Sequence, residues 1–388
     1  MLLKRIFPLF ILFSLLFSSC NRQAVTPITT ERNQPTIQNV TEPEVTEPIP
    51  TEPPSPVELL LDAMTLEEKV GQLFLARCPG TDAIKDIEDY HLGGYILFGV
   101  DFDDKTPEEV TDTITAYQKA SKIPLLIAVD EEGGIVCRVS SHSQFRDSRF
   151  PSPRQLYEQG GLELILQTEQ EKCALLKALG INVNAAPVCD ITTDPEAFMY
   201  SRSLGQSPGE TGRFVAGVVD VMHENRFGGV LKHFPGYGNN TDTHTGIATD
   251  SRTLEELESV DLVPFAAGIT AGCDAIMVSH TFVNCLDTEN PASLSPAVHD
   301  YLRTEMGFEG VIVTDDLVMQ AITDLYGAGE SAVLAVLSGN DLLCSTEYKV
   351  QYEAVLDAVK TGRISQAQLE QSVRRVLQWK YDLGLIPD

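Results

Sequence analysis

The chain has 388 residues, of which 43% are hydrophobic and 7% aromatic, and its formal net charge is −28. This length fits one barrel of roughly 250 residues plus a tail as well as it fits two average domains. The acidic excess argues against nucleic acid as a partner, because phosphate binding requires clustered lysine and arginine side chains.

Residues 1–19 have the order of charged, apolar and small residues that is typical of an export signal. The apolar run over 6–17 is shorter than the roughly 20 helical residues that cross a bilayer, which disfavours a retained transmembrane helix. The end of the segment resembles a bacterial lipoprotein cleavage box, although Phe17 stands where Leu is usual. We therefore expect lipidation of Cys20 and an extracytoplasmic, membrane-anchored protein; the alternative is a signal cut elsewhere that leaves Cys20 unmodified.

Residues 20–56 are rich in Thr, Glu and Pro, and the tripeptide Thr-Glu-Pro occurs three times between residues 41 and 53. Such a segment has too few large apolar side chains to order itself. Chains rich in Pro and in acidic residues are also stiff and extended. We expect 1–19 to be the signal, 20–56 a disordered tether, and 57–388 one catalytic domain.

Seven further cysteines follow Cys20, so at least one of them must be unpaired, and they show no CxxC spacing. Most lie among apolar neighbours, which indicates buried small side chains rather than a disulfide framework. The histidines also lack the spacing of metal ligands, and no metal site is expected.

Short apolar runs alternate with amphipathic stretches from residue 65 onward. Thr65 and Glu68 have the spacing of a capping box that begins a helix. Helical length is found over 107–120, 163–178 and 210–224. Eight buried parallel strands are predicted, over residues 72–76, 94–98, 125–129, 183–186, 230–232, 275–279, 311–314 and 342–344.

Eight strands that alternate with helices predict an α/β fold of the (β/α)8 TIM-barrel type. The competing architecture is an open, doubly wound sheet. That fold usually carries a Gly-rich phosphate turn after its first strand, and none is present here.

Polar side chains end several of the predicted strands. In a barrel these strand ends meet at one rim, where active sites lie. Buried charges are costly unless they are paired or serve a function. Their repeated placement at strand ends therefore favours a polar pocket. The residues concerned are Asp130, Lys232, His233, Ser279, His280, Asp315 and Asp316.

Two of the polar segments have residue types that can act as a nucleophile and as a proton shuttle. Asp315 ends the apolar strand over 310–314, which would hold its carboxylate with little freedom, as a nucleophile requires. The adjacent Asp316 is its competitor, or else a helix cap. Asp242 and His244 lie in a loop rich in Gly, Asn and Thr, where the carboxylate could orient the imidazole as a proton shuttle.

Residues 232–238 read Lys-His-Phe-Pro-Gly-Tyr-Gly, and residues 242–244 read Asp-Thr-His. Together they resemble the signature of glycoside hydrolase family 3, in its β-N-acetylhexosaminidase branch. Further matches occur in order across nearly all of residues 57–383, at 61–65, 93–98, 130–134, 202–205, 313–317 and 372–375.

The resemblance implies a retaining exo-glycosidase that releases β-N-acetylglucosamine from cell-wall fragments or other glycans. The resemblance implies that Asp315 is the nucleophile, that His244 is the acid and base, and that Asp242 is the partner of His244. Most glycosidases use two carboxylates, and here the pair of Asp242 and His244 replaces the second one. The reaction needs no cofactor. The resemblance also supplies sugar-binding candidates, which are Asp130 as an acceptor, Arg202, Lys232 and His233 as donors, and Arg138 as a weaker choice.

Many members of the family take the acid and base from a sandwich domain after the barrel. Here the chain ends at residue 388, so no such domain is expected. That absence favours the N-acetylhexosaminidase over a β-glucosidase. A glycoside phosphorylase and a non-catalytic, surface-anchored glycan-binding lipoprotein stay open, and the sequence indicates no oligomeric state.

Two positions depart from the pattern of this branch. Tyr237 stands where His is usual, and Ile135 stands where Arg is frequent. Tyr forms hydrogen bonds but does not change charge near neutral pH. We therefore expect the loop geometry, the pH dependence and some sugar contacts to differ from those of other members.

The expected anchor is tested by mass spectrometry of the mature N-terminus. An acylated cysteine derived from Cys20 is the expected species, because the small residues before it form the cleavage box. A Cys20→Ala variant should lose the acyl mass and leave the membrane fraction. A mature chain that begins elsewhere, or that carries an unmodified Cys20, would contradict the expectation.

Overall fold

The computed structural model describes residues 55–238, 246–323 and 325–387. Its centre is one parallel sheet of eight strands in the order β11, β9, β7, β6, β3, β2, β1, β12. The strands are β1 (Phe74–Arg77), β2 (Gly94–Leu97), β3 (Leu126–Val129), β6 (Val183–Asn184), β7 (Gly228–Phe234), β9 (Ala275–Val278), β11 (Val311–Thr314) and β12 (Leu343–Ser345). These are the eight predicted strands, with small differences at their ends.

The sheet closes into a barrel where β11 meets the start of β12. Val313 and Leu342 form a parallel bridge. The backbone N–H of Thr314 donates to the carbonyl of Leu342 at 3.1 Å, and that of Leu342 donates to Ile312 at 3.1 Å. This closure confirms the (β/α)8 barrel and excludes the open sheet.

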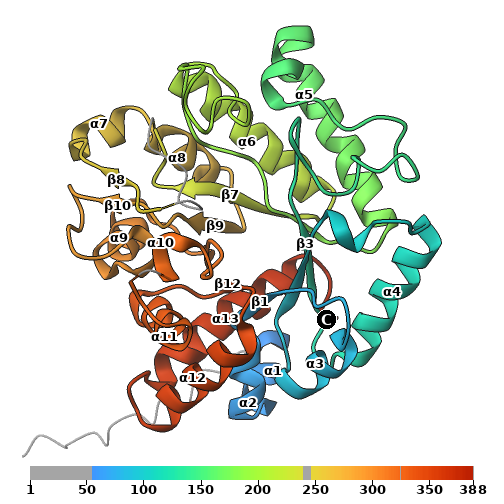
Figure 1. Cartoon of the computed structure of the whole chain (residues 1–388), viewed down its shortest axis with the longest axis vertical. Coiled ribbons are helices and arrows are strands. Elements are labelled where there is room, and N and C mark those ends of the chain that lie inside the picture. Colours follow the sequence, from blue (N-terminus) through green and yellow to red (C-terminus); the bar gives the residue numbers. More distant parts are fainter. Residues whose placement is uncertain (1–54, 239–245, 324, 388) are drawn as a thin grey trace, which may run out of the picture. The chain divides into compact units, whose positions relative to one another are not determined.

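Helices surround the strands, as Figure 1 shows. They are α1 (Pro56–Ala63), α2 (Leu66–Gly71), α3 (Ala83–Tyr90), α4 (Pro107–Ala120), α5 (Pro153–Ala178), α6 (Pro208–Glu224), α7 (Leu254–Ser259), α8 (Leu262–Thr270), α9 (Pro296–Asp300), α10 (Gln320–Thr323), α11 (Ala328–Ser338), α12 (Tyr348–Lys360) and α13 (Gln366–Asp382). Two small sheets lie outside the barrel: β4 (Glu131–Gly133) pairs with β5 (Val136–Cys137), and β8 (Thr249–Asp250) pairs with β10 (Phe282–Val283).

Local signals explain where the helices begin. The predicted capping box of Thr65 and Glu68 is present at α2. The helix predicted from residue 163 begins earlier, at Pro153, where Ser152 accepts from the N–H of Gln155. Gly161, with φ of 67° and ψ of −158°, interrupts the regular pattern inside this helix.

Alternate strand residues pack into two apolar layers. On β11, Val311 and Val313 face the barrel interior, whereas Ile312 packs in the outer layer under the helices. Trp379 of α13 joins the inner layer and approaches Gly228 at the start of β7, where a Cβ atom would lie 3.0 Å from the indole ring. Helix α13 therefore closes the end of the barrel where the strands begin.

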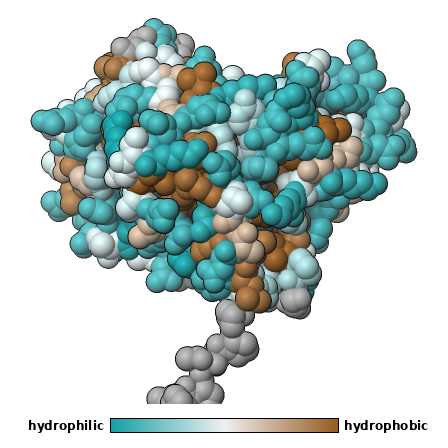
Figure 2. Space-filling model, turned by 90° about the horizontal axis from the view of Figure 1, so that it is seen from below, coloured by the Kyte–Doolittle hydropathy of each residue, from teal (hydrophilic) through white to brown (hydrophobic). Residues whose placement is uncertain are grey.

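Outside these two layers the surface is mainly polar. The face drawn in Figure 2 is mostly hydrophilic, and polar side chains separate its apolar areas. The large apolar side chains that are exposed in the described part of the chain are Leu59, Ile84, Val100, Ile135, Ile247, Leu325 and Val350.

The seven cysteines that the structure describes are all unpaired, as expected, and six of them are buried. Over the described ranges, no helix combines the length and hydropathy needed to cross a membrane. The predicted signal and Cys20 lie outside the described residues.

The buried carboxylate of Asp341 stabilises the seam between β11 and β12. It accepts from Arg303 at 2.5 Å, from Arg375 at 2.9 Å and from the N–H of Ile312 at 2.9 Å. Asp341 has no exposed surface. One carboxylate therefore pairs with two guanidinium groups and satisfies a backbone donor at the point of closure.

We expect Asp341→Ala to lower the free energy of unfolding by about 3 to 5 kcal/mol, because two partly buried cations lose their partner. Urea unfolding measures the change. Asp112→Ala, an exposed change on α4, should stay within about 0.5 kcal/mol of wild type. Equal stability of the two variants would show that the seam does not depend on this carboxylate.

Candidate active site

A cavity of about 670 Å³ opens at the rim where the strands end. Its lining includes seven residues that were predicted from the sequence: Asp130, Arg138, Arg202, Lys232, His233, Asp315 and Asp316. They come from the ends of different strands and from the loops that follow, so only the closed barrel brings them together.

The Lys232 ammonium lies at the centre of the polar side of this cavity. Its Nζ atom is 2.7 Å from Oδ1 of Asp130 and 2.7 Å from Oε1 of Glu132. The Lys232 side chain is only 2% exposed. Burial by itself lowers the pKa of Lys232, but the two carboxylates outweigh it and raise this pKa above its usual value. Lys232 is therefore a fixed positive charge at neutral pH.

Arg202, in the segment between β6 and α6, contacts the Glu132 carboxylate. Its Nε donates to Oε2 of Glu132 at 2.9 Å, and its Nη2 donates to Oε1 at 2.7 Å. Burial by itself raises the pKa of Glu132, but Lys232 and Arg202 outweigh it and hold this pKa well below its usual value. The bidentate pair fixes the plane of the guanidinium group.

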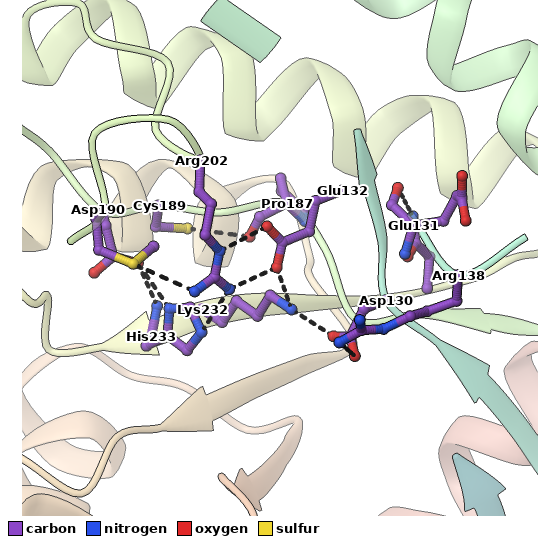
Figure 3. A network of polar contacts seen from close by, with 12 residues as sticks. Asp130, Glu131, Glu132, Arg138, Pro187, Cys189, Asp190, Arg202, Lys232 and His233 are labelled. Carbon is purple, nitrogen blue, oxygen red and sulfur yellow. Dashed lines mark hydrogen bonds and ion pairs between the residues drawn. The ribbon is translucent and has the colours of Figure 1, made fainter. Parts of the chain in front are cut away.

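His233 and Asp190 continue the contacts on the far side of Arg202, as Figure 3 shows. His233 Nε2 is 3.2 Å from Arg202 Nη2, and its Nδ1 is 2.8 Å from Oδ2 of Asp190. Tyr237 packs against the imidazole edge-on, with ring centroids 5.3 Å apart. The Tyr that replaces the usual His thus lies in the wall of the site.

Asp315 and Asp316 follow the end of β11 and also line the cavity. The Asp316 carboxylate accepts from Thr346 Oγ1 at 2.6 Å and from the N–H groups of Val318 and Thr346, both at 3.2 Å. Burial raises the pKa of Asp316. Asp316 thus joins the loop after β11 to the loop after β12, and both Asp315 and Asp316 line the cavity.

Arg138 borders the cavity next to a partly apolar wall. It is 3.4 Å from Oδ2 of Asp130 and lies over the Phe98 ring at 5.1 Å. Ile135, in the turn between β4 and β5, also lines the cavity and is 64% exposed. The position where Arg is frequent in the resembling branch therefore presents an apolar side chain at the rim.

Glu132 and Asp190 were not among the site residues predicted from the sequence. A signal existed for each of them: Glu132 follows the predicted strand over 125–129 by three residues, and Asp190 follows the strand over 183–186 by four. Asp242 and His244 lie outside the described residues. Among the residues that the structure describes, no cluster of His, Cys, Asp and Glu could hold a metal ion.

Comparisons with known proteins agree with this geometry. Residues 65–379 match the model of the glycosyl hydrolase family 3 N-terminal domain. The chain is 32% identical to the beta-hexosaminidase LpqI of Mycobacterium tuberculosis, over 81% of this chain and 82% of that protein. It is 37% identical to a beta-hexosaminidase of Stenotrophomonas maltophilia, over 72% of this chain and 83% of that protein.

Solved structures give the same result. A family 3 beta-N-acetylglucosaminidase from Paenibacillus superposes with a TM-score of 0.77 at 34% identity, over 83% of this chain. The chain spans 63% of the length of that protein. The structure of M. tuberculosis LpqI superposes with a TM-score of 0.77 at 27% identity, and the match covers 86% of this chain and 98% of that one.

The ion network predicts how stability depends on pH. The folded pKa of Glu132 is lowered, so its ionisation stabilises the fold above the unfolded pKa, near 4.5, and this contribution is lost as the pH falls toward the folded value. At about pH 7, Glu132→Gln should lower the free energy of unfolding by roughly 3 to 5 kcal/mol. Below about pH 4.5 the difference from wild type should shrink.

Urea unfolding of both proteins across this pH range measures the effect. Glu163→Gln, an exposed change on α5, should cost less than about 0.5 kcal/mol at pH 7. A Glu132→Gln penalty that stays constant down to pH 3 would contradict the electrostatic assignment.

Proposed function

The chain belongs to glycosyl hydrolase family 3, and from this premise we propose that it is an exo-acting β-N-acetylhexosaminidase. In this proposal it releases terminal β-N-acetylglucosamine from cell-wall fragments or other glycans. The observation that carries the proposal is the cavity in which Asp315 faces a fixed network of two cations and two carboxylates. The named hexosaminidase relatives support the choice of sugar.

The cavity has the chemistry that a pyranose sugar requires. Asp130 offers carboxylate oxygens to hydroxyl groups, and Lys232 and Arg202 offer N–H donors to hydroxyl or acetamido oxygens. Phe98 and Phe198 add apolar surface beside these groups. A site of paired polar groups rejects analogues that lack the matching hydroxyl groups, because its own groups are then left unpaired.

The proposed reaction has two steps with retention of configuration. Asp315 attacks the anomeric carbon while His244 gives its proton to the leaving oxygen, so that a covalent glycosyl ester forms and the glycosidic bond breaks. His244 then takes a proton from water, which attacks the same carbon and releases Asp315. Asp242 orients the imidazole and stabilises its charged form.

We also propose that the protein acts outside the cell membrane. In this proposal Cys20 carries the lipid, and residues 20–56 hold the barrel away from the membrane. The charged and apolar order of residues 1–19 and the Thr-Glu-Pro repeats support this arrangement. Substrates would then be glycan fragments that are present on the outer side of the membrane.

We expect Asp315→Ala to lower kcat for an aryl N-acetyl-β-glucosaminide on the order of 10⁴-fold or more, because the covalent step is lost. Asp103→Ala, an exposed carboxylate between β2 and α4, is the matched control and should keep the wild-type rate. Release of the aryl group measures both. A fluorosugar should add its mass to the peptide that contains Asp315.

Other outcomes would redirect the proposal. Unchanged hydrolysis by Asp315→Ala would exclude this nucleophile. Faster turnover with phosphate and release of a sugar 1-phosphate would identify a phosphorylase. Preference for aryl glucosides would identify a glucosidase, and glycan binding in calorimetry without product release would indicate a glycan-binding protein.

A further inference from the structure

Asp190 lies behind the sugar-binding wall, and its buried carboxylate accepts three N–H donors. Oδ2 accepts from the His233 ring at 2.8 Å and from the His233 backbone at 3.1 Å, and Oδ1 accepts from the Tyr237 backbone at 2.7 Å. The Asp190 side chain has no exposed surface. A carboxylate so placed ties both the imidazole and the following turn to the loop after β6.

The contacts of His233 determine which ring nitrogen carries the proton. An arginine side chain can only donate hydrogen bonds, so His233 Nε2 must accept from Arg202 Nη2. An ionised carboxylate can only accept, so Nδ1 must carry the proton that goes to Asp190. Both conditions hold for the neutral Nδ1–H tautomer and fail for the Nε2–H tautomer and for the imidazolium.

We propose that Asp190 is a positioning residue that holds His233 as the Nδ1–H tautomer and thereby orients the Arg202 guanidinium toward Glu132. Figure 3 shows the resulting line of contacts from Asp190 through His233 and Arg202 to Glu132. Glu132 in turn contacts Lys232, which contacts Asp130. One buried carboxylate thus sets the direction of each donor in the wall.

The alternative tautomer shows why the proton position matters. With the proton on Nε2, two N–H groups would face each other over 3.2 Å, and the guanidinium would have to turn away. It could then no longer keep both of its bonds to Glu132. With the proton on Nδ1, both imidazole nitrogens are engaged within the protein, so the sugar-facing donors of this wall are Lys232 and Arg202.

The first test reads the tautomer directly and does not depend on catalysis. Two-bond ¹H–¹⁵N spectra of ¹⁵N-histidine-labelled protein distinguish a protonated Nδ1 from a protonated Nε2. A His233→Gln variant assigns the signal by removing one of the seven histidines of the chain. We expect an Nδ1–H pattern for His233 in the wild type; an Nε2–H or imidazolium pattern at neutral pH would overturn the proposal.

The second test removes one acceptor while keeping the shape of the side chain. In Asp190→Asn, an amide N–H₂ must face either the imidazole or the Tyr237 N–H, so either the Nδ1–H of His233 or the Tyr237 turn loses its acceptor. We expect the His233 signal to change, and kcat/KM to fall about 10²-fold, as a misplaced binding group can cause. Asp194→Asn, an exposed change in the same loop, is the control and should alter neither.

The expected fall in rate rests on the proposed hydrolase function, whereas the tautomer does not. If the wild type hydrolyses no aryl glycoside, the proposed function fails and the wild-type spectrum still decides the tautomer. If the wild type is active and Asp190→Asn keeps both its rate and its Nδ1–H pattern, Asp190 does not position His233.

Discussion

The contact between Lys232 and the carboxylates of Asp130 and Glu132 is the interaction on which the site depends. A buried ammonium group is costly unless anions surround it, and a buried carboxylate is costly without a cation. These groups therefore require one another, and Arg202 balances the second negative charge. Because they come from β3, β4, β7 and the segment before α6, the network also restrains the ends of separate strands.

The barrel provides the geometry that the network needs. Parallel strands all end at one rim, and the closed barrel brings Asp315, after β11, into the same cavity as Asp130, after β3. An open sheet would leave β11 at one edge, distant from β3. The apolar layers inside and outside the strands stabilise this closure, while α13 closes the other end and leaves the polar rim as the accessible end.

Residues that can contact a sugar differ from residues that hold them in place in how their polar atoms are engaged. Glu132 and Asp190 are almost completely buried, and their oxygens accept from protein donors. Asp130, Lys232 and Arg202 line the cavity. Asp316 also borders the cavity, but its carboxylate accepts from Thr346 and from the N–H of Val318.

Much of this protein could be predicted from the amino-acid sequence. The eight strands, the barrel and the polar strand ends follow from local rules, because side-chain periodicity and helix caps depend on neighbours along the chain. The family signature added the site residues as a set. The bounds of α5 were predicted less well, since Gly160 and Gly161 interrupt the helical pattern that begins at Pro153.

Only the tertiary structure decided which polar residues meet. Glu132 and Lys232 are 100 residues apart in the sequence, and no local pattern pairs them, yet they lie 2.7 Å from each other. Asp190 follows a predicted strand in the sequence, but its role depends on three donors from a different strand and turn, which only the fold brings to it. The contacts between these side chains set how deeply each is buried, whether it is charged and where its proton lies. These contacts form only when the barrel closes.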